Sequence, residues 1–257
     1  MTLRQDHAAV ILEAADVPEY VMEEWRELKQ RTLSQQKYFS VALSGGMTPA
    51  GFYRRLSQEN RREAWKAVHV FLADERYVPL SNPDSNYGML SELLLNKIGL
   101  PPANRHPAPV QEKALEIAAR KYEDEIRQFF ELREDVFPQF DLIVLGMGED
   151  GHTASLFPGQ DSLIEKKHLV YPVKEAPKKH QRLTFTLPVI NNAKNIIFLV
   201  TGEEKANVVS QVLENRNPLL PASMVRPVKG TLTFILDLEA ASLLSPDFRC
   251  ANKTVVQ

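Results

Sequence analysis

Short apolar runs of strand length alternate along the chain with stretches that have helical periodicity. Such alternation is typical of a parallel sheet covered by helices. We therefore predict an α/β fold with a doubly wound, mostly parallel sheet flanked by helices. The 257 residues suffice for one such domain, with room for a small appended subdomain. Strands are predicted at residues 38–43, 68–73, 140–145, 183–187, 196–200 and 231–236, and helices at 20–33, 48–56, from near 85, 111–132, 202–213 and 237–244.

Charge and composition exclude several kinds of partner. The chain has 31 basic and 33 acidic side chains, a formal net charge of -2. Such a balance gives no electrostatic footprint for nucleic acid or an anionic membrane. No run approaches the ~18 apolar residues of a membrane span, and the first residues lack the pattern of a signal peptide, so we expect a cytoplasmic protein. Cys250 is the only cysteine, which excludes an intrachain disulfide and a cysteine-based zinc site.

A glycine-rich loop joins the predicted strand at 38–43 to the next helix. It contains Ser44, Gly45 and Gly46, and Thr48 is the expected N-cap of the helix. Two glycines let the backbone approach a ligand, and a helix start offers unpaired N–H groups and a positive dipole end. The loop therefore has the features of a phosphate site, although a glycine pair also serves simply to turn a chain. This loop has neither the G-x-G-x-x-G pattern of a dinucleotide site nor the Gly-Lys-Ser/Thr of a nucleotide P-loop.

Charged residues follow the predicted strand at 68–73. Arg76 is suited to holding a phosphate or a hydroxyl, because a guanidinium matches the geometry of oxyanions. Asp74 is suited to accepting hydrogen bonds from sugar hydroxyls, and a solvated charge cluster is the alternative for both residues. Asn86 lies in the loop beyond, where its amide either reaches the same cleft or caps the next helix.

The apolar run at 140–145 leads directly into a loop with three glycines in six residues, 146–151, and with Asp150 and His152 two residues apart. Ligands of open parallel sheets bind outside the carboxyl ends of the strands, so chemistry is expected here. We expect His152 at the start of a helix, whose dipole disfavours imidazolium and keeps the ring neutral, as a general base requires. Asp150 either orients the imidazole or binds a sugar hydroxyl.

Other hydrolytic mechanisms find little support in this loop. The nucleophile elbow G-x-S-x-G is missing, and Ser155 is expected inside the helix, which argues against a serine-hydrolase triad. Further ligands at metal spacing are lacking beside His152, so we expect neither a metal nor a cofactor.

The densest basic cluster, residues 178–182, precedes the predicted strand at 183–187. Arg182 adjoins the strand and is the member expected to face a cleft. Lys178 and Lys179 are further candidates for binding an anion, and Lys205 is a weaker candidate of the same type. A solvated basic turn is the alternative.

Together these segments make the chain resemble the 6-phosphogluconolactonase family, from about residue 38 to the predicted helix at 237–244. The resemblance rests on residues 43–49, on 74–76 with Ser85 and Asn86, on 146–159 and on 182–188. It implies a Rossmann-like fold of the glucosamine-6-phosphate deaminase type, no cofactor and a monomer. The implied reaction is hydrolysis of 6-phospho-D-glucono-1,5-lactone, a sugar-phosphate lactone, to 6-phospho-D-gluconate in the oxidative pentose phosphate pathway.

On this resemblance, His152 takes a proton from the water that attacks the lactone carbonyl. The loop at 44–48, Arg76 and Arg182 hold the phosphate, and backbone N–H groups of the glycine loops, with Gly148 among the substrate-binding residues, stabilise the oxyanion. The family usually has Ser where this chain has Met47.

Two other functions remain open. A deaminase of the same superfamily tends to have Asp-Glu-Tyr at residues 74–76, and an acid where this chain has Phe157. A non-catalytic sugar-phosphate sensor on the same fold would commonly carry a DNA-binding segment, for which the sequence before residue 38 offers no basic helix-turn-helix candidate.

Overall fold

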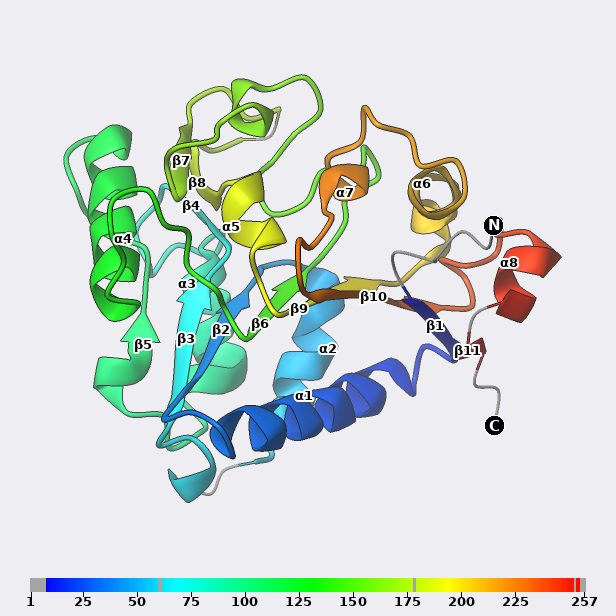
Figure 1. The fold of residues 1–257 in the computed structure, drawn as a ribbon, viewed down its shortest axis with the longest axis horizontal. Coiled ribbons are helices and arrows are strands. Elements are labelled where there is room, and N and C mark those ends of the chain that lie inside the picture. The colour runs from blue at the N-terminus through cyan, green and yellow to red at the C-terminus, as the bar shows by residue number, and fades with distance from the viewer. Residues whose placement is uncertain (1–7, 60–61, 178, 252, 255–257) are drawn as a thin grey trace.

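A parallel sheet runs through the centre of the computed structural model, which describes residues 8–59, 62–177, 179–251 and 253–254 (Figure 1). Within these residues the sheet has eight strands, and all of its paired neighbours are parallel. Their order across the sheet is β11 (Lys253–Thr254), β1 (Ala8–Leu12), β10 (Thr231–Asp237), β9 (Asn195–Val200), β6 (Leu142–Leu145), β2 (Phe39–Leu43), β3 (Val68–Leu72) and β5 (Arg105–His106).

The order of the strands reverses at the centre of the sheet. From β2 the chain continues outward to β3 and β5, whereas β6 returns to the other side of β2 and leads to β9 and β10. In open α/β sheets a ligand-binding crevice forms at such a switch point, outside the carboxyl ends of the strands. The topology therefore directs attention to the loops that follow β2 and β6.

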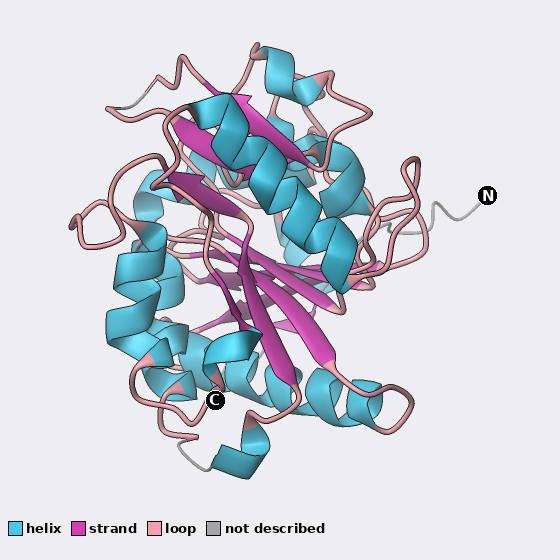
Figure 2. Ribbon diagram, turned by 90° about the vertical axis from the view of Figure 1, so that its left-hand side faces the viewer, coloured by secondary structure: helices cyan, strands magenta, loops and turns pink. Residues whose placement is uncertain are grey.

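Helices cover both faces of the sheet (Figures 1 and 2), and alternate strand residues serve the two faces. Val41 and Leu43 belong to a hydrophobic cluster that includes residues of α1 (Val17–Leu33) and α2 (Met47–Leu56), while Ala42 belongs to a second cluster that includes residues of α4 (Leu115–Phe129), α5 (Leu187–Asn191) and α6 (Ala206–Leu213). All residues of β2, β6 and β9 are buried, as expected for strands covered on both faces. The helices are α1 (Val17–Leu33), α2 (Met47–Leu56), α3 (Asn86–Leu90), α4 (Leu115–Phe129), α5 (Leu187–Asn191), α6 (Ala206–Leu213), α7 (Pro221–Met224) and α8 (Pro246–Ala251).

A second, antiparallel sheet lies at the end of the main sheet toward which β2 and β3 point (Figure 1). Its order is β4 (Asp74–Arg76), β8 (Arg182–Phe185) and β7 (Val170–Val173). Ala73 links the two sheets, because its N–H donates to Leu43 O (3.0 Å) and its carbonyl accepts the N–H of Phe185 (2.8 Å). After Ala73 the chain leaves the main sheet, and β4 pairs with β8 in the small sheet, which places Arg76 opposite Arg182.

The predicted fold class is confirmed, and five local predictions are wrong. Residues 153–158 form turns around an isolated bridge between Thr153 and Leu156, not a helix. Residues 238–243 are also turns, although the Asp237 carboxylate accepts the N–H of Ala240 (2.7 Å) in the manner of an N-cap. The fourth predicted strand ends at Phe185 and is followed by α5, helix α4 is shorter than 111–132, and α2 begins at Met47, so Gly46 rather than Thr48 is its N-cap.

The sequence analysis also missed strands, of which β1 and β7 are the longest. Among the described residues, the helices are all too short or too polar to cross a membrane.

Candidate active site

A cleft of about 360 Å³ opens where the loops after β2 and β6 diverge. Most of the residues predicted from the sequence line it, although they come from five separate segments of the chain. They are Ser44, Gly45, Gly46, Thr48, Asp74, Arg76, Asn86, Gly148, His152 and Arg182. Met47 and Lys205 line the same cleft.

The loop after β2 forms one wall of the cleft. Ser44 is anchored by its carbonyl, which accepts the hydroxyl of buried Tyr53 (2.6 Å). Gly46, at φ 106°, adopts the left-handed backbone from which α2 starts. Gly45 has no room for a side chain, because a Cβ there would lie 1.9 Å from Oδ1 of Asn86. The glycine pair thus brings the start of α2, with its unpaired N–H groups, close to the Asn86 amide.

The loop after β6 holds His152 against Asp150. Nδ1 of His152 is hydrogen-bonded to Oδ1 of Asp150, which also accepts the backbone N–H of His152 (3.2 Å). Gly148 makes this pairing possible, because a Cβ at that position would lie 2.0 Å from Nδ1 and 2.6 Å from the Asp150 carboxylate. The contact between Asp150 and His152 is that of a carboxylate that orients an imidazole.

The Asp150 carboxylate, and not a helix dipole, acts on the His152 ring, because residues 153–160 form turns and an isolated bridge rather than a helix. Burial raises the pKa of Asp150, but the hydrogen bond and charge of His152 outweigh burial and hold that pKa below its ordinary value. An ionised Asp150 requires the proton of the ring on Nδ1, so in the neutral tautomer the lone pair is on Nε2.

Two of the loop amides expected to bind substrate are engaged within the loop itself. The N–H of Gly148 donates to His152 O (2.9 Å), and the N–H of Gly151 donates to Gly148 O (2.9 Å). These bonds hold the loop closed around the His–Asp pair. The Gly148 and Gly151 amides are therefore already paired in this structure, whereas the prediction of oxyanion donors among the other amides of the glycine loops is untouched by these two bonds.

Asp74 is the centre of a buried polar cluster at the floor of the cleft. Its Oδ2 accepts the hydroxyl of Ser155 (2.7 Å), and its Oδ1 accepts the amide of Asn86 (3.2 Å). Nη1 of Arg182 lies 4.0 Å from Oδ2. Both carboxylate oxygens of Asp74 thus already have protein partners, and Ser155, expected in a helix, is a fully buried member of this cluster. The Asn86 side chain reaches the cleft rather than capping α3, whose N-cap is Ser85.

Cations converge on the cleft from three elements. Arg182 is buried, and this burial lowers its pKa while the charge of Asp74 opposes the change. Its guanidinium lies 5.6 Å from the centre of the Phe157 ring, which also packs against the imidazole of His152 (4.7 Å between centroids). Arg76 donates from Nη1 to the carbonyl of Asp84 (2.6 Å). Lys205 lies 3.9 Å from the carboxylate of Glu149.

One of the predicted cations, Lys179, is not brought into the cleft. Lys179 is 80% exposed in its side chain and lies 3.4 Å from the carboxylate of Asp84, outside the lining residues. Lys178 lies outside the described residues.

Unsatisfied polar atoms gather around this cleft. Nine buried side-chain nitrogen or oxygen atoms lack a hydrogen-bond partner within the described part of the chain. Four of them belong to lining residues: Ser44 Oγ, Arg76 Nε, Asn86 Oδ1 and Arg182 Nε. Buried polar groups are nearly always hydrogen-bonded in native proteins, so such a concentration indicates a site built to receive a polar ligand.

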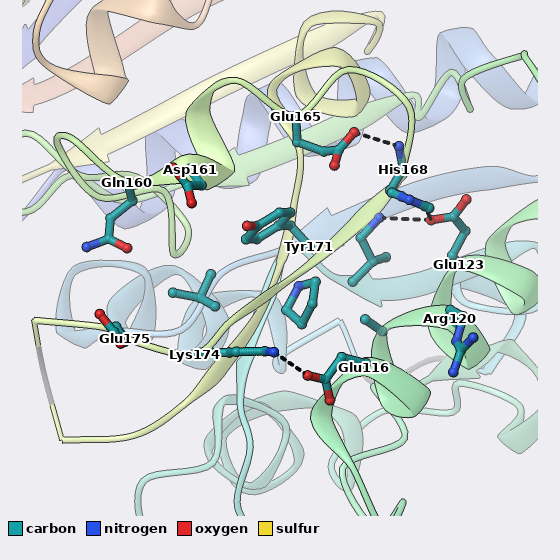
Figure 3. Close-up of a pocket in the computed structure, with 14 residues that line it drawn as sticks. Glu116, Arg120, Glu123, Gln160, Asp161, Glu165, His168, Tyr171, Lys174 and Glu175 are labelled. Atoms are coloured by element: carbon teal, nitrogen blue, oxygen red, sulfur yellow. Dashed lines mark hydrogen bonds and ion pairs between the residues drawn. The ribbon is translucent and has the colours of Figure 1, made fainter.

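A larger groove of about 830 Å³ lies elsewhere, against α4 and β7 (Figure 3). Its charged side chains largely satisfy one another or the backbone. Glu116 pairs with Lys174 (2.6 Å), and Glu123 accepts the N–H of Leu169 (2.8 Å). The residues predicted from the sequence line the smaller cleft and not this groove. No three His, Cys, Asp or Glu side chains within the described ranges are grouped so as to hold a metal ion.

Known proteins resemble this chain over most of its length. Residues 13–234 match the family described as Glucosamine-6-phosphate isomerases/6-phosphogluconolactonase. The chain is 45% identical over 217 residues to 6-phosphogluconolactonase of Rattus norvegicus, covering 82% of each chain. It is 38% identical over 218 residues to 6-phosphogluconolactonase of Synechocystis sp., covering 84% of this chain and 89% of the relative.

Solved structures show the same similarity. The structure of 6-phosphogluconolactonase from Trypanosoma brucei superposes with a TM-score of 0.82 at 30% identity, covering 93% of this chain and 99% of that one. The Thermotoga maritima 6-phosphogluconolactonase gives a TM-score of 0.77 at 34% identity, covering 89% and 99%. A monomeric glucosamine-6-phosphate deaminase gives a TM-score of 0.75 at 21% identity, over 92% and 99%, a likeness that extends to the fold alone.

Proposed function

The chain belongs to the glucosamine-6-phosphate isomerase/6-phosphogluconolactonase family, and from this premise we propose that its cleft hydrolyses 6-phospho-D-glucono-1,5-lactone to 6-phospho-D-gluconate. One observation carries the proposal: an oriented His–Asp pair stands in a cleft lined by cations with unsatisfied hydrogen-bonding groups. The pair supplies a base for water, and the cations supply a binding site for a phosphate.

A lactone is an activated ester, so a positioned water molecule suffices as the nucleophile. Nε2 of His152 takes a proton from this water as its oxygen bonds to the lactone carbonyl carbon. The tetrahedral intermediate then collapses, the bond from that carbon to the ring oxygen breaks, and the imidazolium returns the proton to the departing ring oxygen. Asp150 holds the ring and stabilises its transient positive charge. The product acid releases one proton to solvent.

The remaining groups of the cleft divide between the phosphate and the carbonyl. Arg76, Arg182 and the N–H groups at the start of α2 are suited to the phosphate, because guanidinium groups and helix N-termini match its oxygens. Since the Gly148 and Gly151 amides are engaged within their loop, we assign the developing oxyanion to Lys205. The Lys205 side chain is 16% exposed, which makes its charge more effective than that of a fully solvated lysine.

The neighbourhood of His152 favours lactone hydrolysis over deamination. Phe157 is fully buried and lies against both His152 and Arg182. An aromatic ring at this place supplies no carboxylate for ring opening or for amine chemistry. It gives His152 an apolar wall instead.

A direct assay separates the candidate functions. Purified protein is offered fresh 6-phosphogluconolactone and, separately, glucosamine 6-phosphate, while proton release and ammonia are followed. We expect acid release from the lactone well above its spontaneous rate, and no ammonia. Ammonia without acceleration of lactone hydrolysis would assign a deaminase, and binding without turnover of either compound would assign a sensor.

We further propose that the protein acts as a monomer in the cytoplasm. Every side chain given a role in the cleft comes from one copy of the chain. Light scattering at the concentration of the assay tests the monomer, and imaging of the tagged full-length protein tests the compartment.

A further inference from the structure

Glu75 is a fully buried carboxylate that the proposed mechanism does not use. It is the central residue of β4, between Asp74 and Arg76. One of its oxygens, Oε1, accepts the backbone N–H groups of Arg76 (2.7 Å) and Asn86 (2.7 Å). The other, Oε2, accepts the N–H of Tyr87 (2.8 Å) and the hydroxyl of Ser85 (3.1 Å).

The four donors to Glu75 belong to two segments of the chain, of which the second begins ten residues after Glu75. Arg76 lies on β4, whereas Ser85, Asn86 and Tyr87 form the start of α3. Ser85 extends the connection, because its hydroxyl accepts the N–H of Gly88 (3.0 Å). The carboxylate therefore joins the strand to the helix through hydrogen bonds to neutral groups.

Two of these donors carry side chains that line the cleft. Arg76 and Asn86 each have a buried polar atom without a partner in the described part of the chain, Nε and Oδ1 respectively. Their backbone N–H groups bond the same oxygen of Glu75, which fixes the points from which the guanidinium and the amide leave the main chain. Asn86 is placed tightly, since it also bonds Asp74 and faces Gly45.

From this geometry, and resting on the proposed function, we infer that Glu75 is a positioning residue that sets Arg76 and Asn86 for the sugar phosphate. It touches neither the substrate nor the reacting atoms. Its effect on the reaction passes through the two side chains whose backbone it holds, so it governs substrate affinity rather than the proton transfers at His152.

The chemistry of the site requires a carboxylate and not an amide. Each oxygen of Glu75 accepts two hydrogen bonds. In a Glu75→Gln variant, one of these oxygens becomes an NH₂ group in either orientation of the amide, so two buried donors lose their acceptor. An unsatisfied buried donor is costly, so the segment that carries it must shift. A displacement of about 1 Å at a binding group is enough for effects on the order of 10²-fold.

The test compares Glu75→Gln with Glu123→Gln. Glu123 is a buried carboxylate that accepts the N–H of Leu169 and pairs with Arg127 (2.8 Å), and it lies in the larger groove (Figure 3). Both variants are expected to lower the melting temperature, which measures the structural role that the two carboxylates share. KM and kcat for fresh 6-phosphogluconolactone, together with calorimetric binding of 6-phosphogluconate, measure the effect on substrate binding, which we assign to Glu75 and not to Glu123.

We expect Glu75→Gln to raise KM and the product dissociation constant by roughly 10-fold to 100-fold, with kcat nearly unchanged, and Glu123→Gln to change neither. Equal effects of the two variants, or a fall in kcat at constant KM for Glu75→Gln, would overturn the inference. If Glu75→Gln does not fold, Ser85→Ala removes one of the four donors, and an unchanged KM there would overturn it as well. An inactive wild type would instead contradict the proposed function.

Discussion

Gly148→Ala is the substitution that most directly probes the His–Asp pair. The added methyl group would lie 2.0 Å from Nδ1 of His152, 2.2 Å from Cε1 and 2.6 Å from Oδ1 of Asp150. Non-bonded heavy atoms rest at about 3.5–4.0 Å, so the imidazole has to move by roughly 1.5 Å or more. A base displaced in this way loses its reach to the attacking water, and general-base help contributes ~10²–10⁴-fold. We expect kcat to fall by about that factor, which corresponds to roughly 3–5 kcal/mol of transition-state stabilisation.

A double-mutant cycle with His152→Ala tests this reasoning. Once the ring is removed, the methyl group at residue 148 has little left to displace at Nδ1 and Cε1, so adding Gly148→Ala should lower kcat only slightly further. Gly51→Ala serves as a control. Gly51 lies in α2 and is not among the residues that line the cleft, and its added Cβ would lie at an ordinary 3.4 Å from Pro18. A Gly148→Ala enzyme with wild-type kcat, or full additivity of the two substitutions, would refute the account of this loop.

Two further predictions concern single titratable groups. Asp150→Asn removes the charge that stabilises an imidazolium on His152, so steady-state kinetics should show kcat lowered by about 10-fold or more with a nearly constant KM; an unchanged kcat would contradict the orienting role. Burial, and secondarily His106, lower the pKa of His69 to about 4, against about 6.5 in an unfolded chain. The unfolded state therefore binds more protons between these pH values, so the free energy of unfolding should fall as pH drops from about 6.5 toward 4. His69→Gln should flatten that slope in denaturant titrations, and an equal slope would contradict the assignment.

The sequence was informative about the central part of the fold. The strands β2, β3, β6, β9 and β10 are mostly apolar and mostly buried, as expected of strands covered on both faces, and their alternation with helices predicts the parallel sheet. The glycine loops after β2 and β6 predict the position of the cleft, because the carboxyl ends of parallel strands lie at one edge of the sheet.

Local patterns fail where tertiary contacts override them. Residues 153–158 do not form a helix, since Ser155 is drawn to Asp74 by its hydroxyl and to the Thr184 hydroxyl by its N–H (3.1 Å). Both contacts join segments distant in the chain, so no local pattern announces them. Without that helix, the dipole argument for a neutral His152 was wrong. The imidazole is instead hydrogen-bonded to Asp150, which is one of the two arrangements that the sequence left open.

Glu75 is a second residue whose environment could not be predicted from local sequence. An acid between Asp74 and Arg76 looks like part of a solvated cluster in the sequence, yet it is fully buried. Three of its four donors lie at the start of α3, ten to twelve residues further along the chain, so no local pattern announces these contacts. The available signal in the sequence is Ser85, a typical N-cap residue at the start of α3, preceded along the chain by an acid that has no obvious local partner.

The central claim is that His152 is the general base for hydrolysis of a phosphorylated lactone. The measurement that tests it most directly is kcat for fresh 6-phosphogluconolactone, corrected for spontaneous hydrolysis, in the wild type and in His152→Ala. The account predicts a fall of ~10²–10⁴-fold in kcat with KM changed little, because the residues that bind the phosphate remain in place. Wild-type turnover in His152→Ala would contradict it.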